Sequence, residues 1–148
     1  MNRVLLKRTL LGLWSLWWTV VLATNLADAA QALGALDPSW PFASGNYRLI
    51  AETTARHGPP AWVNAVLFAG VLLWEATATA LFWQAFARHG SAAGRQAVYR
   101  AFTVGLSLWL AFLVADEVCI AYPVEASHLR LFTSQLLTLL AIELLPEG

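Results

Sequence analysis

Long, mostly apolar stretches recur four times along the chain, separated by polar connections. A bilayer core of about 30 Å needs about 20 apolar residues in a helix to cross it. Stretches of that length run over residues 9–27, 61–87, 98–122 and 126–145. In the last stretch, His128 and Arg130 precede the uncharged part, and Pro146 ends any helix. The pattern predicts an all-α protein, a bundle of four transmembrane helices.

The connections between these stretches differ in length. Residues 88–95 are short, polar and contain glycine, so the second and third helices are expected to form an antiparallel hairpin. Residues 28–60 form the one long connection, and the pattern over residues 47–57 predicts a short helix within it. Ser44-Gly45-Asn46, directly before it, can cap that helix. We therefore expect residues 1–148 to form a single integral membrane domain with one long loop.

The distribution of basic residues predicts the orientation. With the N-terminus in the cytoplasm, six of the 9 basic residues lie inside, and they are Arg3, Lys7, Arg8, Arg88, Arg95 and Arg100. The other three, outside, are Arg48, Arg56 and Arg130. Because basic residues favour the cytoplasmic side, both termini are expected inside and the long loop outside.

The first stretch also has features of a secretory signal peptide. Basic residues precede its apolar run, and the small-residue sequence Ala27-Asp28-Ala29 follows it. Trp14, Trp17 and Trp18, however, make this apolar run bulky for a signal peptide. We therefore expect a retained first helix.

Composition excludes several functional classes. Of the 148 residues, 59% are hydrophobic and 12% are charged, and the net charge is 0, which disfavours a nucleic-acid partner and an acidic disordered tail. Cys119 is the 1 cysteine, so the sequence holds no disulfide framework and no multi-thiolate metal site. His57, His89 and His128 fall in or beside predicted loops, and no phosphate-binding loop or nucleophile elbow occurs. We expect no enzyme activity, cofactor or metal. Eight of the 9 basic residues are arginine, which suggests a bacterial source rich in GC.

Glu75 is a carboxylate near the middle of the second predicted helix. Such a group needs a partner, a proton or a water-filled cavity. At helical spacing it shares a face with Asn64, Phe68 and Phe82, which predicts that this face turns towards the other helices. Glu75 is then either a proton or cation relay, or a structural group that hydrogen-bonds between helices.

A second set of polar residues falls near the outer ends of the helices. Asn25 and Asp28 close the first helix, and Asp116 and Glu117 lie late in the third. Arg48 in the long loop is the nearest counter-charge, so a cluster of Asn25, Asp28, Arg48 and Glu117 is one hypothesis. The alternatives are that these residues hold the loop on the bundle, and that Arg48 pairs with Glu52 on the surface.

Four tryptophans fall near mid-membrane instead of at the interfaces, namely Trp17, Trp18, Trp74 and Trp109. Each carries an N–H group that needs a partner in hydrocarbon. They predict either an aromatic pocket for a quinone, lipid or pigment, or simple packing.

Several short sequences give the chain a resemblance over nearly its whole length. These are NLAD (25–28), YRLI (47–50), LLWEA (72–76), ADEV (115–118) and Arg130-Leu131-Phe132. On these residues the chain resembles a bacterial family of predicted small integral membrane proteins, catalogued as a domain of unknown function. The resemblance implies four helices and a long outer loop, and it implies no activity.

These observations lead to three functional hypotheses. The first is a non-enzymatic, multi-pass protein of the bacterial inner membrane that serves as an accessory or assembly subunit of a larger membrane complex. The second is a small homo-oligomeric transporter or channel that uses Glu75. The third is a quinone- or lipid-binding membrane protein. The expected partners are the lipid bilayer and other membrane protein subunits or further copies of the chain.

Overall fold

The computed structural model describes residues 3–91 and 93–145, and every regular element in this part is a helix. The elements are α1 (Arg3–Ala32), α2 (Asn46–Thr54), the 3₁₀ turn η1 (Ala55–His57), α3 (Ala61–Arg88), α4 (Gly94–Cys119) and α5 (Tyr122–Leu144). The prediction of an all-α protein is therefore confirmed.

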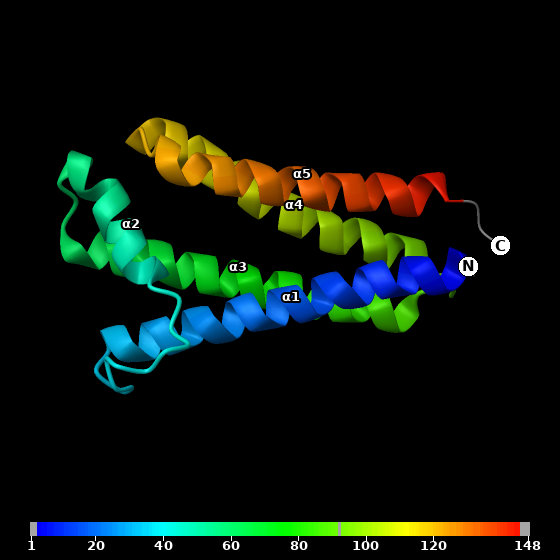
Figure 1. Ribbon diagram of the computed structural model, residues 1–148, viewed down its shortest axis with the longest axis horizontal. Coiled ribbons are helices and arrows are strands. Elements are labelled where there is room, and N and C mark those ends of the chain that lie inside the picture. Colours follow the sequence, from blue (N-terminus) through cyan, green and yellow to red (C-terminus); the bar gives the residue numbers. More distant parts are fainter. Residues whose placement is uncertain (1–2, 92, 146–148) are drawn as a thin grey trace.

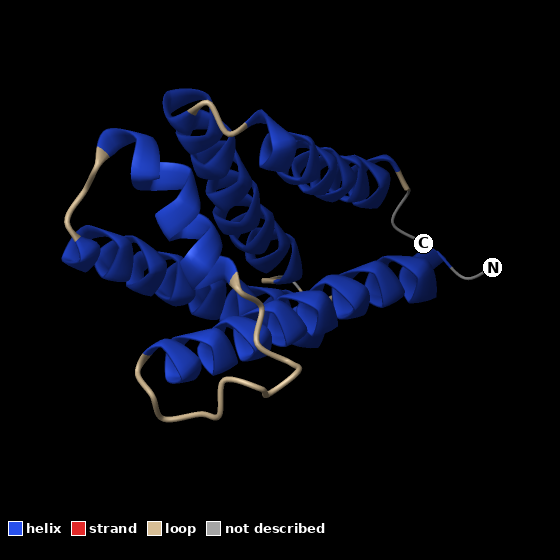
Figure 2. Cartoon of the chain, turned by 60° about the vertical axis from the view of Figure 1, so that its left-hand side comes forward, coloured by secondary structure: helices blue, strands red, loops and turns tan. Residues whose placement is uncertain are grey.

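The four long helices pack in series. α1 packs against α3, α3 against α4, and α4 against α5, while the short α2 lies on α3 at one end of the bundle (Figure 1). We call this the α2 end. α1 begins and α5 ends at the opposite end, and the long loop from α1 to α2 lies at the α2 end (Figure 2).

Three helices, α1, α3 and α4, are long and apolar enough to cross a membrane. They are compatible with an integral membrane protein. α5 has 23 residues, but polar and charged side chains at both of its ends dilute its apolar character. The prediction of a fourth span is thus not confirmed by these helices.

The predicted boundaries differ from the observed ones where the helix ends are polar. α3 matches residues 61–87 to within one residue, whereas α1 continues past Asp28 to Ala32, which shortens the long loop. α4 begins at Gly94 instead of 98, so the connection between α3 and α4 is shorter than the apolar pattern predicted. α5 begins at Tyr122 instead of 126, because Pro123 stands in its first turn, where a proline is well tolerated.

Aromatic side chains fill the middle of the bundle. Trp18, Phe82 and Phe102 are fully buried. The Phe82 ring centroid lies 6.4 Å from that of Trp18 and 5.1 Å from that of Phe102. The indole N–H of Trp14 on α1 donates to the Thr138 hydroxyl on α5 over 3.1 Å. This hydrogen bond links α1 to α5, the first and last helices of the series.

Candidate functional site at the α2 end

A cavity of about 690 Å³ lies at the α2 end, with walls from all five helices. We call it the α2-end cavity. Most of the lining is apolar, and its aromatic members are Trp17, Phe68, Trp74, Trp109 and Phe112. Glu75, Asp116 and His128 are the acidic and basic side chains in the lining. An apolar pocket with a few convergent polar groups is the usual form of a small-molecule site.

Glu75 belongs to a hydrogen-bonded chain that joins three helices. Asn25 Nδ2 on α1 donates to Glu75 Oε1 on α3 over 2.7 Å, and Asn46 Nδ2 on α2 donates to Asn25 Oδ1 over 2.8 Å. Asn25 is fully buried and Glu75 is 3% exposed. The other oxygen, Glu75 Oε2, is buried and has no hydrogen-bond partner among the described residues. A bound molecule that donates to Oε2, or that accepts from Oε2 when this oxygen carries a proton, would satisfy it.

The face of α3 that carries Glu75 is buried, as its spacing predicted. Asn64, Phe68, Glu75 and Phe82 all lie on the buried side of this helix. Near the α2 end, Asn64 Oδ1 accepts a hydrogen bond of 2.8 Å from the Thr54 hydroxyl of α2. The polar residues of this face therefore hold α2 against α3 and also present Glu75 to the cavity.

Asp28 fastens the long loop to the bundle. Its Oδ2 accepts hydrogen bonds from the Ser44 hydroxyl (3.0 Å) and from the backbone N–H of Tyr47 (2.8 Å). The first N–H groups of a helix have no partner inside it, and a carboxylate near that end interacts favourably with the helix dipole. Asp28 thus satisfies the start of α2, in keeping with the structural alternative considered for it.

Arg48 and Glu117 are not brought to Asn25 and Asp28. Arg48 Nε lies 3.6 Å from Glu52 Oε1, one turn along α2, and the two side chains are 83% and 66% exposed. Glu117 is exposed on α4. The hypothesis of a four-residue cluster fails for these two, because α2 turns its charged face outward and α4 turns Asp116, not Glu117, inward. An exposed pair such as Arg48–Glu52 stabilises a protein little.

Asp116 instead pairs with His128 in the first part of α5, a pairing that the sequence did not predict. Nδ1 of His128 lies 2.6 Å from Asp116 Oδ2 on α4. The imidazole stacks on Phe112, with ring centroids 4.7 Å apart, and against Trp109 at 6.3 Å. With Nδ1–H donated to the carboxylate, Nε2 of the neutral ring is an acceptor.

Of the four tryptophans predicted near mid-membrane, three line the α2-end cavity, and the fourth, Trp18, is buried beside it. The Trp109 ring centroid lies 5.6 Å from that of Trp17 and 5.3 Å from that of Trp18. Trp74 Nε1 donates to the Val104 carbonyl over 3.0 Å, whereas the buried Nε1 of Trp109 has no partner among the described residues. The predicted aromatic grouping therefore forms one wall of a cavity that also carries polar groups.

Within residues 3–91 and 93–145, no group of three or more His, Cys, Asp or Glu side chains could hold a metal ion. No family model, curated protein or solved structure matches the chain. The family resemblance noted from the sequence therefore stays a prediction.

Proposed function

We propose that the protein is a multi-pass membrane protein that binds a hydrophobic small molecule of the quinone or lipid class in the α2-end cavity. The observation that carries this proposal is an aromatic cavity of about 690 Å³ whose wall contains a buried carboxylate oxygen, Glu75 Oε2, with no described partner. Of the three hypotheses drawn from the sequence, this cavity favours the ligand-binding one.

The proposal includes α5 as a fourth span. Its 23 residues extend about 34 Å at 1.5 Å per residue, which is enough to cross a core of about 30 Å. Four spans leave both chain ends on one side of the bilayer. The end of the bundle where α1 begins also carries Arg88 and Arg95, so the bias of basic residues supports a cytoplasmic location for it, in a bacterial inner membrane.

The chemistry of the lining limits the ligand. Flat aromatic walls suit a ring or an acyl chain, and the two polar groups suit a molecule with one or two oxygen atoms on an otherwise apolar body. A carbonyl would accept a hydrogen bond from a protonated Glu75, and a hydroxyl could donate to its carboxylate or to His128 Nε2. Quinones and long-chain lipids both combine these features.

The first experiment asks whether the full chain, purified in a mild detergent, binds such a molecule. Organic extracts of the protein are analysed by mass spectrometry, and a benzoquinone with a decyl tail is titrated as the probe while tryptophan fluorescence is followed. We expect saturable quenching. The proposal is overturned if the extract contains no bound molecule and the probe shows no saturable binding.

Two variants and a control locate the binding. Val71→Phe places a ring in the cavity and should abolish probe binding, whereas Val114→Phe, on an exposed position of α4 outside the lining, should leave it unchanged. Glu75→Gln keeps an acceptor for Asn25 but replaces Oε2, and should weaken binding about tenfold, which corresponds to about 1.4 kcal/mol. Equal affinities for Val71→Phe and Val114→Phe would contradict a site in this cavity.

The same preparation tests the other two functions. A second polypeptide found reproducibly by native mass spectrometry would favour an accessory subunit. Solute flux in liposomes that is lost in Glu75→Gln would favour a homo-oligomeric transporter.

A further inference from the structure

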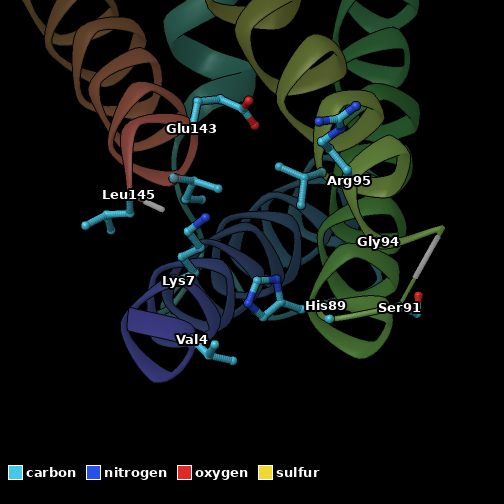
Figure 3. A pocket seen from close by; sticks show the side chains of 11 residues that line it. Val4, Lys7, His89, Ser91, Gly94, Arg95, Glu143 and Leu145 are labelled. Carbon is cyan, nitrogen blue, oxygen red and sulfur yellow. The ribbon is translucent and has the colours of Figure 1, made fainter. Parts of the chain in front are cut away.

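A second cavity, of about 600 Å³, lies at the opposite end of the bundle, where α1 begins and α5 ends. We call it the Lys7 cavity. Its basic side chains come from three segments: Lys7 from α1, His89 from the connection after α3, and Arg95 from the first turn of α4. Figure 3 shows these side chains around one space, with Glu143 of α5 on its border.

Lys7 is the most unusual of these residues, because it is 8% exposed and has no hydrogen-bond or ion-pair partner among the residues that the structure describes. Its ammonium nitrogen is not one of the buried polar atoms without a partner, so this charge reaches the cavity and has no described ion-pair partner there. A ligand with negative charge in the cavity would supply the missing partner.

The other groups around the cavity also favour an anion. Arg95 adds a second permanent positive charge, and the first turn of α4 adds the positive end of a helix dipole. Glu143 is the acidic residue of the lining, and its Oε2 already accepts a hydrogen bond of 2.8 Å from the Tyr99 hydroxyl. Two fixed positive charges therefore stand against one carboxylate that has its own donor.

Apart from Gly90, Ser91 and Gly94, the remaining lining is aliphatic. Val98 and Ile142 are buried beside Lys7, and Val4 and Leu145 border the same space. A site with cations at one level and aliphatic side chains beside them matches a phosphate group that carries a hydrophobic chain. Basic pockets between helices on the cytoplasmic side of a membrane bind anionic lipid headgroups in this way.

We propose that the Lys7 cavity binds a phosphate group, with Lys7 and Arg95 as its cationic partners. The source of the phosphate is either the headgroup of an anionic phospholipid or a soluble phosphate ester. This inference does not depend on the ligand proposed for the α2-end cavity, because none of the residues that line one cavity lines the other.

The test uses the full chain in two arms. In the first, the protein is placed in nanodiscs of phosphatidylcholine with or without one fifth phosphatidylglycerol, and native mass spectrometry counts the retained lipids. In the second, inorganic phosphate and glycerol phosphate are added to the protein in an uncharged detergent, and the midpoint of thermal unfolding is measured. Binding in the first arm alone identifies a lipid headgroup, and binding in both arms identifies phosphate itself.

Three variants make the result specific. Lys7→Gln should lower the affinity for phosphatidylglycerol about tenfold, and Arg95→Gln should lower it in the same direction. Arg48→Gln, which removes an exposed cation at the α2 end, should leave it unchanged. Arg95→Gln also keeps the test valid if Lys7→Gln does not fold. The proposal is overturned if the wild type shows no preference for phosphatidylglycerol and no response to phosphate, or if all variants bind like the wild type.

Discussion

The hydrogen bond between Asn25 and Glu75 should be measurable as a coupling free energy between α1 and α3. Replacing Asn25 by alanine removes the donor to Glu75 Oε1, at 2.7 Å, and the acceptor for Asn46 Nδ2, at 2.8 Å. Hydrogen bonds between membrane helices contribute about 0.6 kcal/mol on average and about 1.7 kcal/mol at most. Because Asn25 makes two of them, we expect Asn25→Ala to lower the free energy of unfolding by about 1–3 kcal/mol.

A double-mutant cycle isolates the bond to Glu75 from the rest of this loss. The four proteins are the wild type, Asn25→Ala, Glu75→Ala and the double variant, and reversible unfolding in mixed micelles is followed by tryptophan fluorescence. The coupling should be about 0.6–1.7 kcal/mol. It should sit at the high end of this range, since Asn25 is fully buried and water cannot replace either partner.

A control cycle pairs Asn25→Ala with Glu143→Ala, a carboxylate of the Lys7 cavity at the other end of the bundle. Distant residues without shared partners should be additive to within about 0.5 kcal/mol. If the Asn25–Glu75 coupling is no larger than that of the control pair, the bond does not stabilise the fold and the reasoning is refuted.

Three further predictions concern the backbone and the long loop. Gly94→Ala should destabilise the protein by about 1 kcal/mol or more, because a Cβ at Gly94 would meet a backbone oxygen at 2.5 Å. Gly70→Ala, where a Cβ would meet no atom within 4 Å, should stabilise α3 by up to about 1 kcal/mol, and equal unfolding midpoints for the two variants would contradict this. Ile120 has a φ of 56°, which a β-branched residue adopts at a cost, so Ile120→Gly should raise the free energy of unfolding by about 1 kcal/mol. A loss of stability in this variant would contradict strain at Ile120. Hydrogen bonds from the Ser39 hydroxyl and, to a lesser extent, from the Ser39 backbone N–H lower the pKa of Asp37 below its usual 3.8. Ser39→Ala removes the hydroxyl and should raise the pKa of Asp37 in an NMR titration, and an unchanged pKa would exclude the hydroxyl contact. Any stability from this contact is present at neutral pH and lost as the pH falls through the native pKa.

The sequence predicted best what depends on one helix alone. The apolar run of α3 and the face that carries Asn64, Phe68, Glu75 and Phe82 follow from length and helical period, and both are present. The start of α5 was predicted four residues too late, because the apolar pattern takes no account of a proline that is tolerated in the first turn.

The pairings between helices could not be predicted in the same way. The Asn25–Glu75 bond depends on the rotation of α1 against α3, and the Asp116–His128 pair depends on the tight turn at Ile120. Arg48 was assigned to the cluster because opposite charges were expected at one depth, but Glu52 lies one turn away on the same helix. Depth along the membrane can be estimated from sequence, whereas the direction in which each side chain points across the bundle requires the packed structure.

The aromatic layer formed around Trp18, Phe82 and Phe102 divides the interior of the bundle into two compartments. In a bilayer, the α2-end cavity and the Lys7 cavity would each exchange molecules with a different leaflet. Under the two binding proposals, the occupancy of the two cavities would depend on lipid asymmetry, a property that is lost when the protein is studied in detergent and regained in vesicles with distinct inner and outer lipids.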